Sequence, residues 1–104
     1  MSPIPKELFD PLKSERPECR CLRKMRTQIL GVSGEPEVAE YLARIDESYV
    51  KLGCVDERIK LLEQRIAILE DLEKTGEASP QMIKERARYE VELENLKKTF
   101  KELI

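Results

Sequence analysis

Three cysteines carry the most reactive chemistry in this chain, at positions 19, 21 and 54. Cys19 and Cys21 stand two apart, so on a helix they point about 200° apart and cannot hold one metal ion together. We expect Cys19 to pack in the core, and Cys54 to pack or lie at the surface. Cys21 is expected at the surface, with a reactive thiol as the alternative because arginines adjoin it. An odd number of cysteines without disulfide-framework spacing is typical of a reducing compartment.

The residues needed for most catalytic sites are missing from the sequence. The chain contains no histidine, which is the commonest general base and a frequent zinc ligand. No glycine-rich phosphate loop, Ser-His-Asp set or pair of converging carboxylates is visible either. The sequence therefore predicts a protein that is not an enzyme and that uses no metal or cofactor.

A basic cluster lies near the N-terminus, where Arg20, Arg23 and Lys24 share one helical face. Residues 1–30 hold seven basic side chains against four acidic ones, whereas residues 31–74 hold six basic against eleven acidic. Three or four charges bind phosphates only weakly and salt-dependently, so we expect these side chains to pair with the acidic residues of a helix predicted at about 36–74, in this or a neighbouring chain. Nucleic acid is therefore not the expected partner. The alternative function, if the basic face does bind nucleic acid, is a small nucleic-acid-associated regulator.

The elements that position these residues are predicted to be helices. Four of the six prolines fall within the first seventeen residues, so residues 1–16 are predicted to form an extended arm. Residues 17–104 are predicted to form a single domain, with helices at about 17–30, 36–74 and 80–103. The predicted fold class is all-α: a short N-terminal helix and a long central helix that forms an antiparallel coiled-coil hairpin with the C-terminal helix.

The arm carries three apolar residues, Leu8, Phe9 and Leu12. They are candidates for anchors that fix the arm to a helical surface. We expect the arm to fold back on the chain's own helices, and docking on a neighbouring chain is the alternative.

The hairpin is predicted from two apolar stripes that flank the turn at residues 75–80. When the stripes are paired across the turn, the two residue numbers of each pair add up to 155, as for Leu62 with Leu93. A loop this short permits few other registers. Glu73 and Arg86 stand on the stripes near the loop and are expected to form a partly buried ion pair.

The central helix is predicted to continue through Gly53, where the apolar stripe slips by three residues and turns toward a different neighbour. Further apolar residues lie off the stripes and widen the apolar surface beyond what two helices cover. We predict that they form a face for a second copy or a helical partner. These residues are Leu61, Ile68, Leu72, Ile83, Val91 and Tyr41.

These features together predict a non-catalytic helical module for protein–protein interaction. It would act as an oligomerising adaptor, scaffold or subunit, either as a homodimer or with a helical partner protein. No apolar run approaches the length of a membrane span, and the proline-rich start is unlike a signal peptide. The predicted location is therefore intracellular and cytoplasmic, with the nucleus as an alternative.

Overall fold

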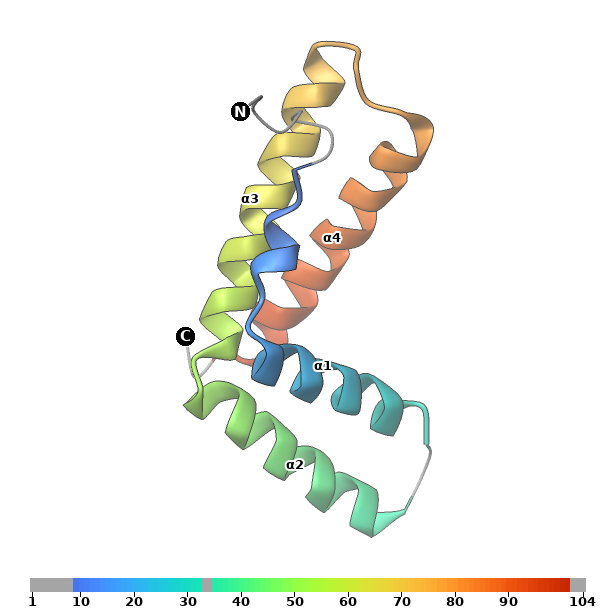
Figure 1. Ribbon diagram of the computed structural model, residues 1–104. Helices are drawn as coiled ribbons and strands as arrows, with labels where there is room; N and C mark the ends of the chain where they lie inside the picture. Colours follow the sequence, from blue (N-terminus) through green and yellow to red (C-terminus); the bar gives the residue numbers. More distant parts are fainter. Residues whose placement is uncertain (1–8, 33–34, 102–104) are drawn as a thin grey trace.

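The computed structural model describes residues 9–32 and 35–101, and over these residues the fold is all-helical. Helices α3 and α4 run side by side in opposite directions and form a rod, with the short 3-10 helix η2 lying along it (Figure 1). Helices α1 and α2 form a second pair that branches from one end of the rod (Figure 1). The elements are η2 (Pro11–Ser14), α1 (Pro17–Leu30), α2 (Pro36–Lys51), α3 (Cys54–Lys74) and α4 (Pro80–Thr99).

Proline begins most of these helices, because its fixed φ suits the first turn and its missing N–H has no partner there in any case. It stands at the start of η2, α1, α2 and α4. Before α4, the side chain of Ser79 adds a cap by accepting a hydrogen bond from the backbone N–H of Met82 at 3.2 Å. Local sequence signals thus set where four of the five helical elements within the described residues begin.

The predicted continuous helix over residues 36–74 is wrong. The chain leaves helical geometry after Lys51 and resumes it at Cys54. Gly53 takes a φ of 75° and a ψ of 18°, in the left-handed region that a side chain would disfavour by about 1–2 kcal/mol. The slip of the apolar stripe near Gly53 therefore marks a corner between two helices, and not a slip within one continuous helix.

Arg16 fastens this corner from the arm. Its guanidinium donates to the backbone carbonyl of Leu52, and its backbone N–H and Nε donate to the Glu57 carboxylate at 2.9 and 2.6 Å. Desolvation opposes ionisation of Glu57, but the hydrogen bonds from Arg16 outweigh it and lower the pKa of this carboxyl group. One residue of the arm therefore donates hydrogen bonds both to the C-cap residue at the end of α2 and to a side chain in the first turn of α3.

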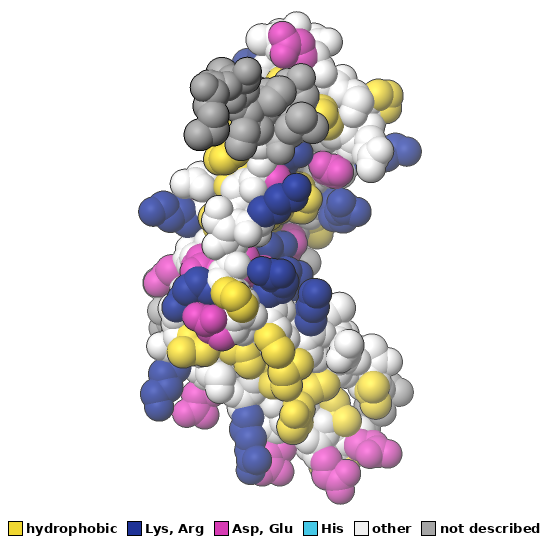
Figure 2. Space-filling model, in the orientation of Figure 1, with side chains coloured by type: hydrophobic (Ala, Val, Ile, Leu, Met, Phe, Trp, Pro, Cys, Tyr) yellow, Lys and Arg dark blue, Asp and Glu magenta, His cyan; other side chains and the backbone are white. Residues whose placement is uncertain are grey.

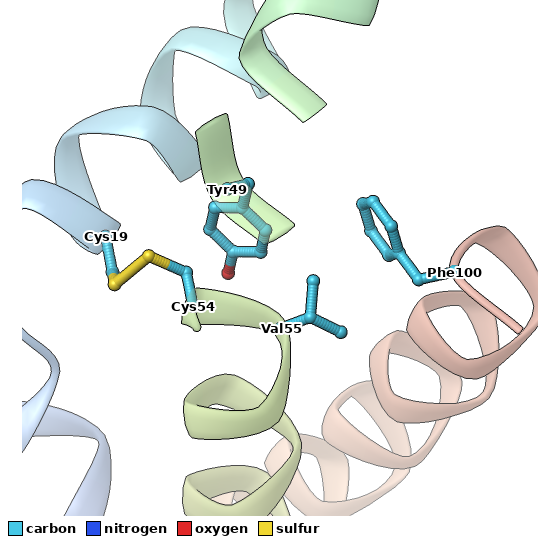
Figure 3. Close-up of a cluster of buried hydrophobic side chains, with 5 residues drawn as sticks. All are labelled: Cys19, Tyr49, Cys54, Val55 and Phe100. Carbon is cyan, nitrogen blue, oxygen red and sulfur yellow. A yellow bond between two sulfur atoms is a disulfide. The ribbon is translucent and has the colours of Figure 1, made fainter. Parts of the chain in front are cut away.

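A disulfide joins Cys19 on α1 to Cys54 at the start of α3 (Figure 3). Both cysteines are fully buried, whereas Cys21 is free and exposed. The interpretation that the cysteine spacing indicates no disulfide is therefore wrong for this pair, as is the surface alternative for Cys54. The prediction of a reducing compartment depends on that interpretation and loses its basis, because disulfides are typical of oxidising compartments.

Helix α3 forms the centre of the rod, with nine of its 21 residues buried. One face holds residues of the predicted stripe, including Val55, Leu62 and Leu69. A second face is buried too, and it includes Leu61 and Leu72 at 9% and 1% exposure. Leu61 and Leu72 are therefore not on an open surface, and their predicted place on an exposed partner face is wrong.

The arm packs over α3 through η2, which explains part of this extra burial. Pro11 is buried and Leu12 is half-buried, whereas Phe9 stays 46% exposed. The described part of the arm thus lies on the chain's own rod. Leu8, the remaining predicted anchor, lies outside the described residues.

Candidate functional site in the angle between the helix pairs

The first component of the candidate site is Arg58 on α3, which is buried at 6% exposure. Its Nε and Nη2 donate to the carboxylate of Glu92 on α4 at 2.6 and 3.0 Å. Its Nη1 lies 3.7 Å from the carboxylate of Glu15, which is itself buried and accepts three hydrogen bonds from Arg23 on α1. The hydrogen bonds with Glu15 raise the pKa of Arg23. This network connects the arm, α1, α3 and α4.

Arg65 forms a second arginine site, two turns further along α3. Its guanidinium lies 3.6 Å from Glu85 on α4 and 3.9 Å from Asp10 in the arm, and it donates to the backbone carbonyl of Phe9. Each buried arginine of α3 therefore meets one glutamate of α4 and one acid of the arm. Since an unpaired charge is costly to bury, the acids of the arm help to hold both arginines in place.

Sequence reasoning missed both arginines, although a signal was present. Arg58 and Arg65 share a spacing of three and four residues with Leu61, Ile68 and Leu72. This spacing puts all five on one helical face. A charged residue that recurs every seven positions within an apolar stripe indicates a buried ion pair.

The two helix pairs meet at a small apolar cluster (Figure 3). The rings of Tyr49 on α2 and Phe100, just after α4, lie 6.1 Å apart between their centres, at a tilt of 33°. Burial raises the pKa of Tyr49 to about 12, and the nearby negative charge of Glu15 adds to the effect. The cluster consists of Cys19, Tyr49, Cys54, Val55 and Phe100.

Beside this cluster, a cavity of about 400 Å³ opens between α1 and α4. Arg26 and Arg88 line it, together with the apolar side chains of Val91, Leu96 and Phe100. Guanidinium groups donate hydrogen bonds and stay charged at neutral pH, so this lining can bind and orient an anion rather than transfer protons.

The predicted basic residues share one face of α1, but they do not pair with the acidic residues that the structure describes in the predicted 36–74 helix. Arg23 is committed to Glu15, whereas Arg20 and Lys24 are exposed and make no ion pair with any residue in the described ranges. Lysine and arginine side chains gather where the arm meets α1, above a band of hydrophobic side chains over α1 and α2 (Figure 2).

The predicted partner face is likewise divided. Ile68 is half-buried on the rod, while Ile83 and Val91 are 43% and 58% exposed on α4. Val91 lines the cavity between α1 and α4, whereas Tyr41 lines a different groove on α2. These residues therefore do not form one continuous surface.

The groove that contains Tyr41 lies where α1 ends and α2 begins. It has a volume of about 340 Å³, and its apolar lining comes from Ile29, Val32, Val38 and Tyr41. Val32 and Tyr41 are 57% and 49% exposed. The end of the α1/α2 pair that lies farthest from the rod is thus an open apolar surface.

Comparison with protein-family models, with curated proteins and with solved structures finds no match for this chain. Within residues 9–32 and 35–101, no three side chains of the types His, Cys, Asp and Glu are grouped so as to hold a metal ion. No helix in the same part of the chain is long and apolar enough to span a membrane.

Proposed function

We propose that this chain is a non-catalytic helical interaction module that associates with a second copy of itself through the α1/α2 pair. The observation that carries the proposal is the open apolar groove of Ile29, Val32, Val38 and Tyr41. Contiguous apolar surface of this kind, bordered by polar residues, is typical of interaction sites.

The distribution of burial supports an interface at this place. Helix α1 buries only Cys19, and α2 buries only Ile45 and Tyr49. Cys19 and Tyr49 belong to the cluster at the joint with the rod, so the outer half of the α1/α2 pair lacks a covering layer. Helices with an apolar stripe gain most of their stability from a layer packed over it, which a second copy would supply.

The charges on the two helices favour a second copy as the occupant. Helix α1 carries four basic residues and one acidic residue, whereas α2 carries four acidic and two basic residues. In a two-fold contact the same surface of both chains is used, so α1 of one copy can lie along α2 of the other. Lys24 and Glu37 are exposed and make no ion pair with any described residue, so both are available for such a contact.

The rod would support this interface as an antiparallel coiled-coil hairpin in the register that adds up to 155. Four ion pairs between α3 and α4 are consistent with this register, because their residue numbers add up to values close to 155. The sum is 150 for both pairs on one edge of the seam, and 159 and 160 for the two pairs on the other edge. The four pairs are Arg58–Glu92, Arg65–Glu85, Glu73–Arg86 and Glu63–Lys97.

Sedimentation velocity at micromolar concentration tests the proposal. The wild-type chain should sediment as a dimer, and the double variant Val32→Glu/Tyr41→Glu should sediment as a monomer with unchanged helical circular dichroism. The matched control, Ile83→Glu/Val91→Glu, puts the same charges on exposed apolar positions of α4 and should remain a dimer. A monomeric wild-type chain, or equal dissociation of both double variants, would overturn the proposal.

A further inference from the structure

The cavity between α1 and α4 has two kinds of wall and is separate from the proposed dimer surface. Its volume of about 400 Å³ lies within the range of small-molecule sites. Val91, Leu96 and Phe100 form an apolar wall, and Arg26 and Arg88 bring positive charge to the same space. The cavity therefore offers both apolar contact and charge to one ligand.

The two arginines have hydrogen-bond donors to spare. Arg26 donates from Nε to Asp46 at 2.7 Å, and neither of its Nη groups has an acceptor within the described part of the chain. Arg88 makes no ion pair with any of the described residues. Both guanidiniums lie against aromatic rings, Arg26 at 5.7 Å from the centre of Phe100 and Arg88 at 5.6 Å from that of Tyr89. An arginine that stacks through its face can still donate from its edge.

The other charged groups of the lining do not neutralise Arg88, and Arg26 is paired with Asp46 through its Nε alone. Arg23 is held by three hydrogen bonds to Glu15, and Glu92 is held by two from Arg58. The one carboxylate of the lining is thus already neutralised from inside the protein. An anion that enters the cavity would meet the two guanidiniums without a competing acid in the lining.

We propose that this cavity binds a small organic anion, a carboxylate or phosphate ester with an aromatic or aliphatic group. The planar, forked donors of Arg26 and Arg88 match the oxygens of the acid group. Val91 and Leu96 contact the apolar body, and Thr27, Asn95 and Thr99 add polar groups at the wall. An anion without an apolar group, or an apolar group without an anion, uses only half of the lining.

Three probes at constant ionic strength separate these contributions: 1-naphthyl phosphate, 1-naphthol and inorganic phosphate. The chain has no tryptophan, so the anisotropy of naphthalene fluorescence reports binding of the first two directly, and inorganic phosphate is added as a competitor. We expect 1-naphthyl phosphate to bind at least about tenfold more tightly than either of the others. Equal affinity for 1-naphthol and 1-naphthyl phosphate would overturn the proposal, because it would show that the charge of the phosphate group does not contribute to binding.

Two variants assign the binding to this cavity. Arg88→Gln should weaken 1-naphthyl phosphate binding about tenfold, and Val91→Asp should weaken it at least as much. Arg88 and Val91 are both exposed, so neither change removes a core contact. Arg44→Gln is the control, since it removes the same charge from the exposed surface of α2 and should leave affinity unchanged. Equal affinity of Arg88→Gln and the wild-type chain would overturn the proposal.

Discussion

Helix α3 of the rod and the α1/α2 pair differ in how far other elements cover them. Helix α3 packs against α4 on one side and against η2 on another, and nine of its residues are buried. Helices α1 and α2 bury three residues between them. Helix α3 therefore supplies most of the buried side chains, whereas the outer end of the α1/α2 pair keeps apolar surface exposed.

Two buried arginines of the rod and one exposed ion pair of α2 show the same contrast. On the rod, Arg58 and Arg65 have side chains that are only 7% exposed. On α2, the pair Arg44–Glu40 has side chains that are 73% and 70% exposed. Exposed pairs contribute about 0–1 kcal/mol, whereas removing one partner of a buried pair is far more costly. Substitutions can therefore test the comparison directly.

The largest effect is expected for Arg58→Ala. This change leaves the buried Glu15 without one of its two arginine partners and removes the partner of Glu92. The free energy of unfolding should fall by about 3–5 kcal/mol, measured by urea denaturation at fixed protein concentration. Arg44→Ala is the matched control and should change it by less than about 0.5 kcal/mol. Similar losses for both variants would show that burial does not distinguish the two regions.

The faces of α3 also show how far the sequence predicts the structure. The apolar stripe of α3 and the turn before α4 are readable because helical periodicity and a proline after a serine are local signals. The second face of α3 is predicted only in part: the sequence indicates its leucines and an arm that folds back on the helices, but not that the arm covers this face. Which element covers a helical face depends on long-range packing, and one sequence gives no direct measure of it.

The corner at Gly53 and the disulfide are not predicted from the sequence because they too depend on long-range contacts. A glycine inside a helical pattern is compatible with a helix, a bulge or a turn, and only its φ decides among them. Arg16 and Glu57 stabilise the turn, yet they are 41 residues apart in the sequence. Cys19 and Cys54 become neighbours only because the chain turns there, so their spacing alone could not identify them as a pair.

Reduction of the disulfide should have the next largest effect. The Cys19–Cys54 bridge closes a loop with a sequence separation of 35, and its loss should lower the free energy of unfolding by about 3–4 kcal/mol. Denaturation with and without a phosphine reductant measures the change. Since the bridge ties α1 to the start of α3, amide exchange should increase first in α1 and α2. The variant Cys21→Ser should respond to the reductant as the wild-type chain does, and no change in either chain would contradict the prediction.

Tyr49, at the joint between the regions, should make stability depend on alkaline pH. Its pKa is raised from 10.0 to about 12 in the folded chain, chiefly by burial. The folded state therefore keeps the proton more tightly than the unfolded state. The contribution of Tyr49 to the free energy of unfolding should be fully present below pH 10, and about 2–3 kcal/mol should be lost as the pH rises to about 12. Tyr49→Phe should lack this part of the loss, and an unchanged pH profile in that variant would count against it.

The smallest effect is expected at the open end of the α1/α2 pair. Ile29 lines the apolar groove and is half-buried, whereas Ile66 on α3 is 8% exposed. In the monomeric Val32→Glu/Tyr41→Glu background, Ile66→Ala should cost about 2–5 kcal/mol and Ile29→Ala about 1 kcal/mol, because less apolar area is lost at position 29. Denaturation curves of the two variants measure both values.

The same pair of substitutions in the wild-type background tests whether the groove is covered on association. If a second copy covers it, Ile29→Ala should cost more there than in the monomeric background, while the cost of Ile66→Ala stays the same. The additional loss should depend on protein concentration, because the stability of a dimer is linked to its association by mass action. An Ile29→Ala cost that is equal in both backgrounds at every concentration would mean that the α1/α2 pair gains no layer from a second copy.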